Sequence, residues 1–299
     1  MQEFAARGDV YYPLHCYSLS HLVPSLITYY NMSKIIRSCS VLSLYDPFST
    51  RSYLIHSHPP MALTQKCNNG LDNVSLMKIA LVGGTGDIGT GFALRLMCSH
   101  EIIIGSRKED KARESASAIM QLEGANGNIW GTDNASAVAV ADAVILCVPP
   151  EHLKSVTYDL STSFNHQLVI SPVVPLSYDG KFFRFNPPPE GSSALQAKSL
   201  LPPQIRVVAA FHTVPAAALQ AKDRILKGDV LICGDDAEAV DMVRSLTMDI
   251  KNLRPLFVGP LAASSQVESL TPMLLNVARK NKIKEAGVSI ISERPPAPN

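Results

Sequence analysis

KIALVGGTGDIG, residues 78–89, is the stretch of this chain that decides its fold. Its first part, Lys78–Val82, is short and apolar, which is typical of a strand buried on both faces of a parallel sheet. Three glycines follow at the spacing G-x-G-x-x-G: Gly84, Gly86 and Gly89. Beyond them, apolar residues recur at helical spacing: Ala93, Leu96 and Met97. The stretch therefore predicts a strand, a glycine turn and a helix with one buried face.

Each glycine of this turn has a use if a dinucleotide binds there. The first permits the tight turn from strand to helix, the second lets the backbone approach a pyrophosphate, and the third lets the helix pack closely on the sheet. The exposed N–H groups and the positive end of the helix then bind the phosphates. The spacing alone is weak evidence, but its place between a strand and a helix supports the functional interpretation. We predict a dinucleotide site rather than a purely structural glycine turn.

The end of the next predicted strand, Glu101–Gly105, indicates which dinucleotide binds. NAD sites usually carry Asp or Glu there, about 20 residues after the motif, to accept hydrogen bonds from the ribose 2′-hydroxyl. This chain has Ser106 and Arg107 instead, with Lys111 one turn further on. A hydroxyl and cations bind a 2′-phosphate, which an acid repels. Solvated charges are the alternative, but cations are poorly placed at the start of a helix. The pattern favours NADP over NAD.

Further buried runs alternate with helical segments along the chain. The predicted strands are 142–148, 168–171 and 206–211, and the predicted helices lie around 109–122, 151–160 and 192–200. This alternation predicts an α/β fold with a doubly wound, Rossmann-type parallel sheet. Each of these strands ends in a turn that contains proline, and ligands of such sheets bind beyond the carboxyl ends of strands. The turns are candidates for the walls of a nicotinamide pocket, although proline also stiffens a loop for purely structural reasons.

The pattern changes from about residue 216 onward. A short strand at 229–233 precedes a helix that runs to about residue 250 and that Asp235 or Asp236 can cap. A strand at 254–258 and a long helix at 264–280 follow. We expect an NADP-binding Rossmann domain over 77–215 and a smaller C-terminal α+β domain over 216–291, which closes over the cofactor or forms a dimer. The proline-rich end, 292–299, is expected to be a flexible tail.

Residues 1–76 differ from the rest of the chain in composition. They hold seven of the nine tyrosines and three of the six cysteines, with few acids and no sustained helical or alternating pattern. They lack the basic start and apolar stretch of a secretory signal, and they are too poor in arginine for a typical organelle transit peptide. We expect an unstructured extension, or a start codon assigned too early, with the functional protein beginning near Met77.

Charge and composition exclude several classes of protein. Lys plus Arg total 27 and Asp plus Glu total 26, so the net charge is +1, and binding to nucleic acid through a basic face is not expected. No apolar run approaches the roughly 18 residues that span a bilayer. The six cysteines form no Cys-x-x-Cys pair, which argues against a metal site and fits idle thiols in a reducing cytoplasm.

Side chains for acid–base or nucleophilic catalysis are scarce. The chain has no phosphate-loop motif, no H-E-x-x-H, no G-x-S-x-G and no Tyr-x-x-x-Lys pair. Beyond residue 76, His152 and His212 are the histidines at predicted strand ends, and we interpret each as a hydrogen-bonded structural residue rather than an acid or base. The second substrate therefore needs no strong proton donor, and direct hydride exchange between two stacked rings fits this scarcity.

Taken in order, these motifs resemble the NADPH-dependent coenzyme F420 reductases, the F420H2:NADP oxidoreductases of archaea and some bacteria. The segments that carry the resemblance are 77–89, 105–107, 171–175, 212–216, 233–236 and 267–272. Each motif is modest alone, but their order and spacing from Met77 to about Ile290 are specific. The resemblance implies reversible hydride transfer between C4 of the nicotinamide and C5 of an 8-hydroxy-5-deazaflavin, in a cleft between the domains, with NADP and coenzyme F420 as small-molecule partners and a homodimer as the expected assembly.

The resemblance also implies roles for individual residues. The pyrophosphate would lie on the glycine turn, at Gly84, Thr85, Gly86, Asp87, Ile88 and Gly89. The 2′-phosphate would be held by Ser106, Arg107 and Lys111, and the nicotinamide pocket would be lined by Pro150, Val174 and Ala216. Val148 is a further expected cofactor-binding residue. His212 and Ala286 would lie near the deazaflavin ring. No catalytic side chain and no metal are implied. Pro149-Pro150 and the proline-rich stretch 186–190 depart from the family pattern near the cleft.

Other functions stay open at this point. An NADP-dependent reductase of a small imine or hydroxy acid would place a Lys or another acid–base group in the second domain, where Lys280, Lys282 and Lys284 resemble a solvated helix end. A non-catalytic protein would bind NADPH without turnover. A relative of the cytoplasmic domain of membrane ferric reductases is a minor alternative, against which the lack of membrane spans argues.

Overall fold

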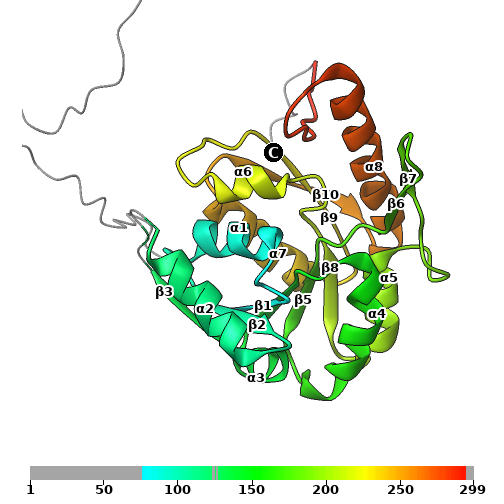
Figure 1. Cartoon of the computed structure of the whole chain (residues 1–299). Coiled ribbons are helices and arrows are strands. Elements are labelled where there is room, and N and C mark those ends of the chain that lie inside the picture. The colour runs from blue at the N-terminus through cyan, green and yellow to red at the C-terminus, as the bar shows by residue number, and fades with distance from the viewer. Residues whose placement is uncertain (1–75, 123–124, 126, 294–299) are drawn as a thin grey trace, which may run out of the picture. The chain divides into compact units, whose positions relative to one another are not determined.

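The computed structural model describes residues 76–122, 125 and 127–293 of the chain (Figure 1). The predicted extension over residues 1–76 lies outside the described residues, apart from Leu76. Residues 294–299 of the predicted tail lie outside them as well. Both expectations stay predictions.

An eight-stranded sheet forms the centre of the described part, in the order β10-β9-β8-β5-β4-β1-β2-β3. Its strands are β1 (Lys78–Val82), β2 (Glu101–Ser106), β3 (Asn128–Asp133), β4 (Ala143–Leu146), β5 (Leu168–Ser171), β8 (Arg206–Ala209), β9 (Gly228–Gly234) and β10 (Leu253–Gly259). All neighbouring pairs are parallel except β8 and β9. The strand order reverses between β1 and β4, where ligands of doubly wound sheets bind. The predicted Rossmann-type α/β fold is confirmed.

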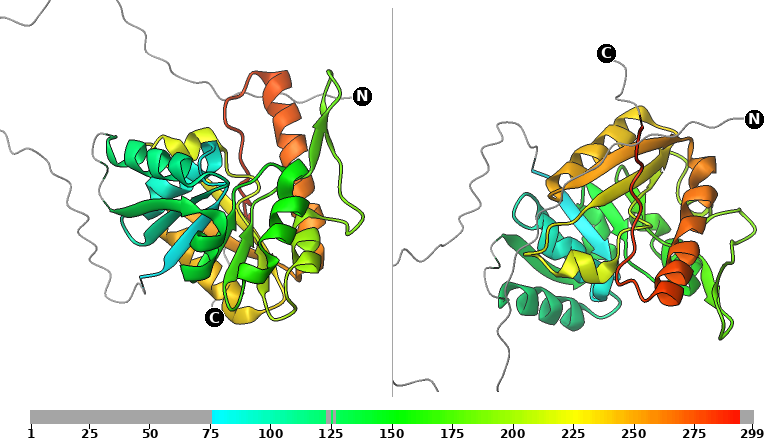
Figure 2. Two further views of the ribbon diagram at one scale, coloured as in Figure 1. Left: turned by 60° about the horizontal axis from the view of Figure 1, so that its bottom comes forward. Right: turned by 90° about the horizontal axis from the view of Figure 1, so that it is seen from above.

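Helices cover both faces of this sheet, as the left view of Figure 2 shows. They are α1 (Asp87–Leu96), α2 (Glu109–Met120), α3 (Asn134–Val140), α4 (Pro150–Asp159), α5 (Ser193–Leu200), α6 (Ala216–Gln220), α7 (Ala237–Asp249) and α8 (Ser264–Asn281). Successive side chains of a strand point to opposite faces. Ile79 and Leu81 of β1 accordingly pack in one hydrophobic cluster with α1, α2 and α7, while Ala80 and Val82 pack in a second cluster with α3, α4 and α5.

The region after residue 215 shares the main sheet. β9 pairs antiparallel with β8, through Val208 opposite Gly234 and Ala209 opposite Cys233, and β10 continues the sheet beyond β9. The predicted cap of α7 is Asp236, whose Oδ1 accepts the Ala239 N–H at 2.8 Å. The predicted domain boundary at 215 stays a prediction. None of the helices in the described part combines the length and apolar character needed to cross a lipid bilayer.

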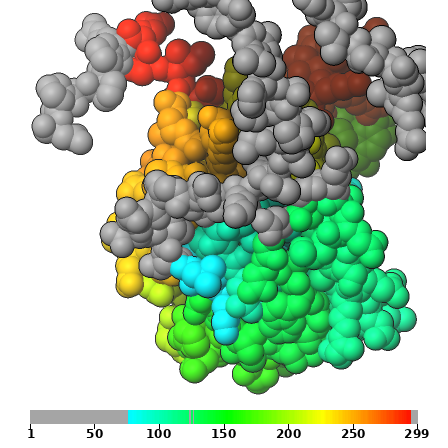
Figure 3. All heavy atoms as spheres, turned by 90° about the vertical axis from the view of Figure 1, so that its left-hand side faces the viewer, coloured from blue at the N-terminus to red at the C-terminus, as the bar shows by residue number. Residues whose placement is uncertain are grey.

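Several elements were not predicted from the sequence: β3, α3, α6 and the hairpin of β6 (Leu176–Tyr178) with β7 (Phe183–Phe185). The hairpin lies beside α8 in both views of Figure 2, and the Asn276 amide bonds both backbone groups of Phe183, at 2.8 Å and 2.7 Å. Figure 3 shows the face on which α2 and β3 lie, where the teal and green residues pack closely. β3 is the outermost strand on that side of the sheet.

A buried carboxylate fastens α8 to α5. Glu268 has no exposed surface, and its two oxygens accept the N–H groups of Ser193 at 2.9 Å and Ala194 at 3.1 Å. These N–H groups belong to the first turn of α5, where negative charge is favourable. Burial nevertheless raises the pKa of Glu268 from 4.5 to about 7, against the lowering effect of the two hydrogen bonds. The carboxyl group therefore titrates inside the fold near neutral pH.

We expect Glu268 to make the protein less stable as the pH rises from about 4.5 to about 7. In this window the Glu268 carboxyl keeps its proton in the folded state but has already released it in the unfolded state. The stability is therefore fully present below the pKa of the unfolded state, and it is lost as the pH rises through the pKa of the folded state. The loss should amount to about 1–3 kcal/mol, since one pKa unit corresponds to about 1.4 kcal/mol. Thermal unfolding of wild type and Glu268→Gln between pH 4 and pH 8 checks this.

The stability of Glu268→Gln should depend less on pH than that of wild type. Glu114→Gln, an exposed change on α2, should follow wild type. The same slope in Glu268→Gln as in wild type would contradict the expectation.

Candidate functional site

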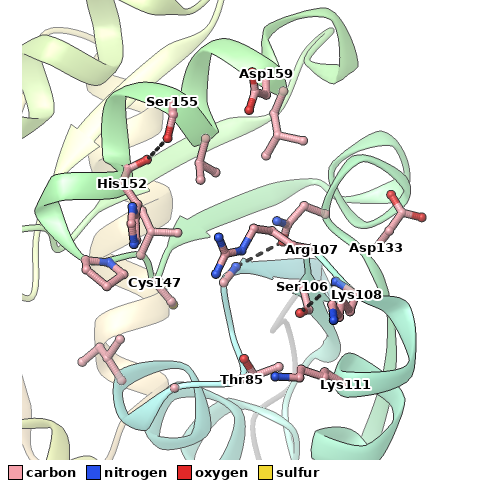
Figure 4. Close-up of a pocket in the computed structure, with 18 of the residues that line it drawn as sticks. Thr85, Ser106, Arg107, Lys108, Lys111, Asp133, Cys147, His152, Ser155 and Asp159 are labelled. Carbon is pink, nitrogen blue, oxygen red and sulfur yellow. Dashed lines mark hydrogen bonds between the residues drawn. The ribbon is translucent and has the colours of Figure 1, made fainter.

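A cavity of about 1220 Å³ opens at the carboxyl ends of β1, β2 and β4 (Figure 4). Its walls come from the glycine turn, the start of α2, the turn from β3 to α3, the end of β4 and the face of α4. Nine of the predicted site residues line it: Thr85, Gly86, Asp87, Ile88, Ser106, Arg107, Lys111, Val148 and Ala216. This is the place where the reversal of strand order predicts a ligand.

The glycine turn is built from close backbone approaches. The Gly84 N–H donates to the carbonyls of Leu81 at 2.9 Å and Gly105 at 3.0 Å, which ties the turn to β2. A Cβ on Gly89 would lie 2.3 Å from the Gly84 oxygen, and a Cβ on Gly84 would lie 2.6 Å from the Leu81 oxygen. A Cβ on Gly86 would meet no atom within 4 Å, because this residue borders the open cavity. Gly84 and Gly89 thus allow the close backbone packing of the turn, and they do not line the cavity.

The start of α1 has no side-chain cap and borders the cavity. Gly86 is the N-cap residue and provides no side-chain cap, so the first N–H groups of the helix have no partner from that side chain. Such N–H groups, together with the helix dipole, bind phosphate. The open space beside Gly86 and these N–H groups fit a pyrophosphate.

The end of β2 carries the predicted cations. The side chains of Arg107 and Lys111 lie around the cavity with Thr85 and Ser106 (Figure 4). Lys108 lines it too, and its N–H donates to the buried Ser106 Oγ at 3.3 Å. At the end of β2, where an NAD site usually carries a carboxylate for the ribose 2′-hydroxyl, this chain has Ser106 and Arg107. Asp133, at the end of neighbouring β3, also lines the cavity. This part of the cavity therefore fits a 2′-phosphate.

Sequence reasoning missed the polar support of the turn and the far wall of the cavity. Asn134, at the start of α3, accepts the Gly83 N–H at 3.2 Å and lines the cavity. On the opposite side α4 contributes these residues: His152, Ser155, Val156 and Asp159. No motif marks them, because their place follows only from the packing of α3 and α4. Pro150 and Val174 line neither this cavity nor the second one, so their predicted role stays a prediction.

A second cavity, of about 270 Å³, adjoins the first. The two share Ile88 and Ala216, and the second is lined further by His212, Thr213, Val214, Pro215, Thr271, Leu274, Leu275, Ala278, Glu285 and Ala286. It brings together His212 and Ala286, which the sequence resemblance placed near one ring although they are far apart in the chain. Its walls are mostly apolar and come from α8, the start of α6 and the segment after α8.

The His212 ring is buried, and neither of its nitrogens, Nδ1 or Nε2, forms a hydrogen bond to the described residues. The residue is 6% exposed. This geometry does not support the interpretation of His212 as a hydrogen-bonded histidine. Burial lowers its pKa from 6.5 to about 3, against a smaller raising effect from the backbone of Ser171, so the ring is neutral at physiological pH. A neutral imidazole can donate one hydrogen bond and accept another.

The backbone around His212 is held from both sides. Phe211 adopts a φ of 69°, which is costly for a residue with a side chain, and its ring packs edge-on against Phe92 of α1 at 5.2 Å. The Thr271 hydroxyl donates to the His212 carbonyl at 2.9 Å. These contacts fix the histidine between α1 and α8.

The fold and the two joined cavities define a dinucleotide-binding α/β protein with room for a second ligand, and comparisons with known proteins agree. Residues 78–175 match the family described as "NADP oxidoreductase coenzyme F420-dependent". The chain is 38% identical to the F420-dependent NADP reductase of Methanocaldococcus jannaschii over 219 residues, which cover 72% of this chain and 98% of that protein. It is 33% identical to the reductase of the same name from Methanothermobacter thermautotrophicus, over 73% of this chain and 96% of that protein.

A solved structure supports the fold independently. It comes from Arthrobacter sp. FB24, is named for a proposed F420-dependent NADP reductase, and has a TM-score of 0.62 at 21% identity, over 72% of this chain and 100% of that chain. The sequence relatives show the family: this chain belongs to the F420-dependent NADP reductases. The resemblance that the sequence motifs indicated is confirmed.

Proposed function

We propose that this protein transfers a hydride reversibly between NADP(H) and coenzyme F420, an 8-hydroxy-5-deazaflavin. The observation that carries the proposal is the junction of the two cavities, because Ile88 and Ala216 belong to both. A dinucleotide whose phosphates lie on the glycine turn and whose nicotinamide reaches this junction would meet a ring in the second cavity.

The residues of the larger cavity bind and orient the dinucleotide. The start of α1 would hold the pyrophosphate, and Ser106, Arg107 and Lys111 would hold the 2′-phosphate through charge-assisted hydrogen bonds. Val148 and Ala216 would limit the space for the nicotinamide. The groups for the phosphates and the apolar residues near the nicotinamide lie in different parts of the cavity, which favours one orientation of the dinucleotide.

The residues of the smaller cavity exclude water and offer one polar contact. Leu274, Leu275 and Ala278 form an apolar wall, which limits the access of water to the reacting atoms. The unpartnered His212 ring is available for a hydrogen bond to a polar group of the ligand. When bound, the nicotinamide and the deazaflavin supply the hydride chemistry themselves. The protein's part is to hold the two reacting carbons at near-attack distance, about 3–3.5 Å.

The geometry does not favour the alternative reductases. Lys280, Lys282 and Lys284 are exposed at the end of α8, and none of them lines the second cavity. A reductase that relies on a lysine would lack this group there, since the titratable residues that line the second cavity are His212 and Glu285. A non-catalytic NADPH-binding protein would have no need for a second cavity joined to the first.

The cellular setting and the assembly form part of the same proposal. Cys147 and Cys233 are buried free thiols, and burial raises the pKa of Cys233 to about 11, which suits inert cysteines in a cytoplasmic protein. Exposed apolar side chains on α8 and β10 support a homodimer: Met273, Val277, Phe257 and Val258. The binding partners that we propose are the two small-molecule coenzymes, and neither nucleic acid nor a membrane is among them.

We expect the purified full-length protein to bleach the visible absorbance of oxidised F420 when NADPH is added, and to restore it with NADP⁺ after F420 has been reduced. The rate should be at least about tenfold lower with NADH, because a single charged hydrogen-bonding contact contributes about 1.5–3 kcal/mol. A cyclic imine, a 2-oxo acid and FMN serve as control acceptors. Oxidation of NADPH with one of these but not with F420 would favour an alternative reductase. Binding of NADPH without turnover of any acceptor would indicate the non-catalytic protein.

A further inference from the structure

Arg95 joins the dinucleotide-binding helix to the wall between the two cavities. It lies in the last turn of α1 and donates to five backbone carbonyls of the segment 218–224. Nε bonds the oxygen of Leu219 at 2.8 Å, Nη1 bonds those of Lys222 at 2.9 Å and Arg224 at 3.1 Å, and Nη2 bonds those of Ala218 at 2.9 Å and Ala221 at 2.6 Å. A guanidinium group has five N–H donors, so every donor of Arg95 is used on this segment.

The segment that Arg95 holds cannot keep its shape alone. α6 has five residues, far fewer than the roughly 12 that an isolated helix needs in water. The last carbonyls of a helix have no partner within it, and a cation is favourable at that end. Arg95 supplies both the donors and the charge. The helix therefore depends on α1 for its position.

Two further contacts bind α6 to α1. The Gln220 amide donates to the Asp87 carbonyl at 2.9 Å, next to the glycine turn. A Cβ on Gly91 would lie 2.6 Å from the Leu219 Cβ, so the two helices touch at this glycine. Figure 1 shows α6 lying beside α1 along its length. The contacts at Arg95, Gly91 and Gln220 therefore fix α6 from the last turn of α1 to its first.

The other end of α6 forms part of both cavities. Ala216, its first residue, lines the first and the second cavity, and Pro215 before it lines the second. The segment after α6 is linked to the second cavity indirectly, because the side chain of Arg224 forms an ion pair with Glu285, the neighbour of Ala286. Glu285 and Ala286 both line the second cavity. The segment that Arg95 holds is thus connected to the second cavity at both ends, through Ala216 before it and through the Arg224–Glu285 ion pair after it.

We infer that Arg95 is a positioning residue for hydride transfer: by fixing α6 on α1, it sets the second cavity in register with the helix that binds the dinucleotide phosphates. The inference rests on the proposed function. Arg95 lines neither cavity, so it acts through Ala216 and the Arg224–Glu285 pair and does not touch the reacting atoms. Misplacement of reacting groups by about 1 Å, even from a distant residue, can cost roughly 100-fold in rate.

The test compares Arg95→Met, Arg95→Lys and Arg244→Met with wild type, all as the full chain. Arg244 lies on the surface of α7, contacts Asp241 and Phe257, and is a matched control for the loss of one arginine. For each protein we would measure kcat, both KM values and the primary deuterium isotope effect with NADPH deuterated at C4. The Kd of NADPH from its fluorescence and amide hydrogen exchange over residues 216–224 give readouts that do not depend on turnover.

We expect Arg95→Met to lower kcat by about 10- to 100-fold and to raise the isotope effect, because hydride transfer becomes the slow step. The Kd of NADPH should change little, since the phosphate contacts remain, while the amides of 216–224 should exchange faster. Arg95→Lys, which keeps the charge and part of the donor set, should restore part of kcat, and Arg244→Met should match wild type. If Arg95→Met lowers only the Tm, with kcat and isotope effect unchanged well below the Tm, Arg95 is merely structural and the inference is overturned.

Two outcomes separate this inference from the proposed function. If wild type does not exchange hydride between NADPH and F420, the proposed function fails whatever the variants do. If wild type is active and the Arg95 variants keep its kcat and isotope effect, only the inference fails. Should Arg95→Met not fold, Arg95→Lys and Gln220→Met carry the test, because each removes part of the same attachment. Wild-type kcat in both would then overturn it.

Discussion

Arg107→Ala should raise the KM for NADPH by about 10- to 100-fold and leave the KM for NADH nearly unchanged. A hydrogen bond to a charged group contributes about 1.5–3 kcal/mol, and each 1.4 kcal/mol is tenfold in affinity. Arg107 lines the larger cavity at the end of β2, beside Ser106 and Lys111, where we propose that the 2′-phosphate binds and distinguishes the two coenzymes. The ratio of the KM for NADH to the KM for NADPH should therefore also fall by about 10- to 100-fold.

The measurement is the initial rate at saturating F420 with each coenzyme varied. Arg113→Ala is the matched control, because Arg113 is an exposed arginine of α2 that pairs with Glu109 at 2.6 Å and does not line the cavity. It should leave both KM values as in wild type. An equal rise in the two KM values for Arg107→Ala would remove Arg107 from the 2′-phosphate site and assign it a general role in binding or folding.

The parts of the fold that the sequence predicted are those determined locally. β1, the glycine turn and α1 follow one another within a short stretch, and each has a pattern that few other structures produce. Arg107 was placed at this cavity for the same reason, since it directly follows the second strand of such a unit, and its role at the 2′-phosphate stays a prediction. The long helix α8 was predicted from its spacing of apolar residues and found at Ser264–Asn281.

The parts that were missed depend on contacts between distant segments. β3 is an edge strand with polar residues at both ends, and its exposed positions give no apolar run. α6 is too short for a periodic pattern, and Arg95 reaches it across more than 120 residues of chain. The unpartnered ring of His212 was also unpredictable, because burial and the absence of a partner are set by the packing of α8 and not by the neighbours of His212 in sequence.

The turn itself makes the last and most severe prediction. Gly89→Ala should lower the Tm of the free protein and weaken NADPH binding by about 100-fold or more. The new Cβ would lie 2.3 Å from the oxygen and 2.5 Å from the Cα of Gly84. This overlap is with backbone, so it is relieved only by moving the start of α1 away from the turn, and overpacking of this kind costs about 1–3 kcal/mol. The groups that must move are those that would bind the pyrophosphate.

Gly86→Ala is the matched control for this change, because it adds the same methyl group three residues earlier. No atom lies within 4 Å of its new Cβ, and its φ of −90° suits alanine. The free protein should therefore unfold near the wild-type Tm, while the methyl group occupies the space through which the pyrophosphate approaches the backbone. A ligand that binds only the folded state raises its Tm. Addition of NADPH should therefore raise the Tm of wild type. Gly86→Ala should have a wild-type Tm without ligand and a much smaller rise with NADPH. Gly89→Ala should have a lower Tm without ligand and also a small rise with NADPH. A normal starting Tm together with a wild-type gain in Gly89→Ala would mean that the helix can retreat without cost, and the third glycine would then have no part in the site.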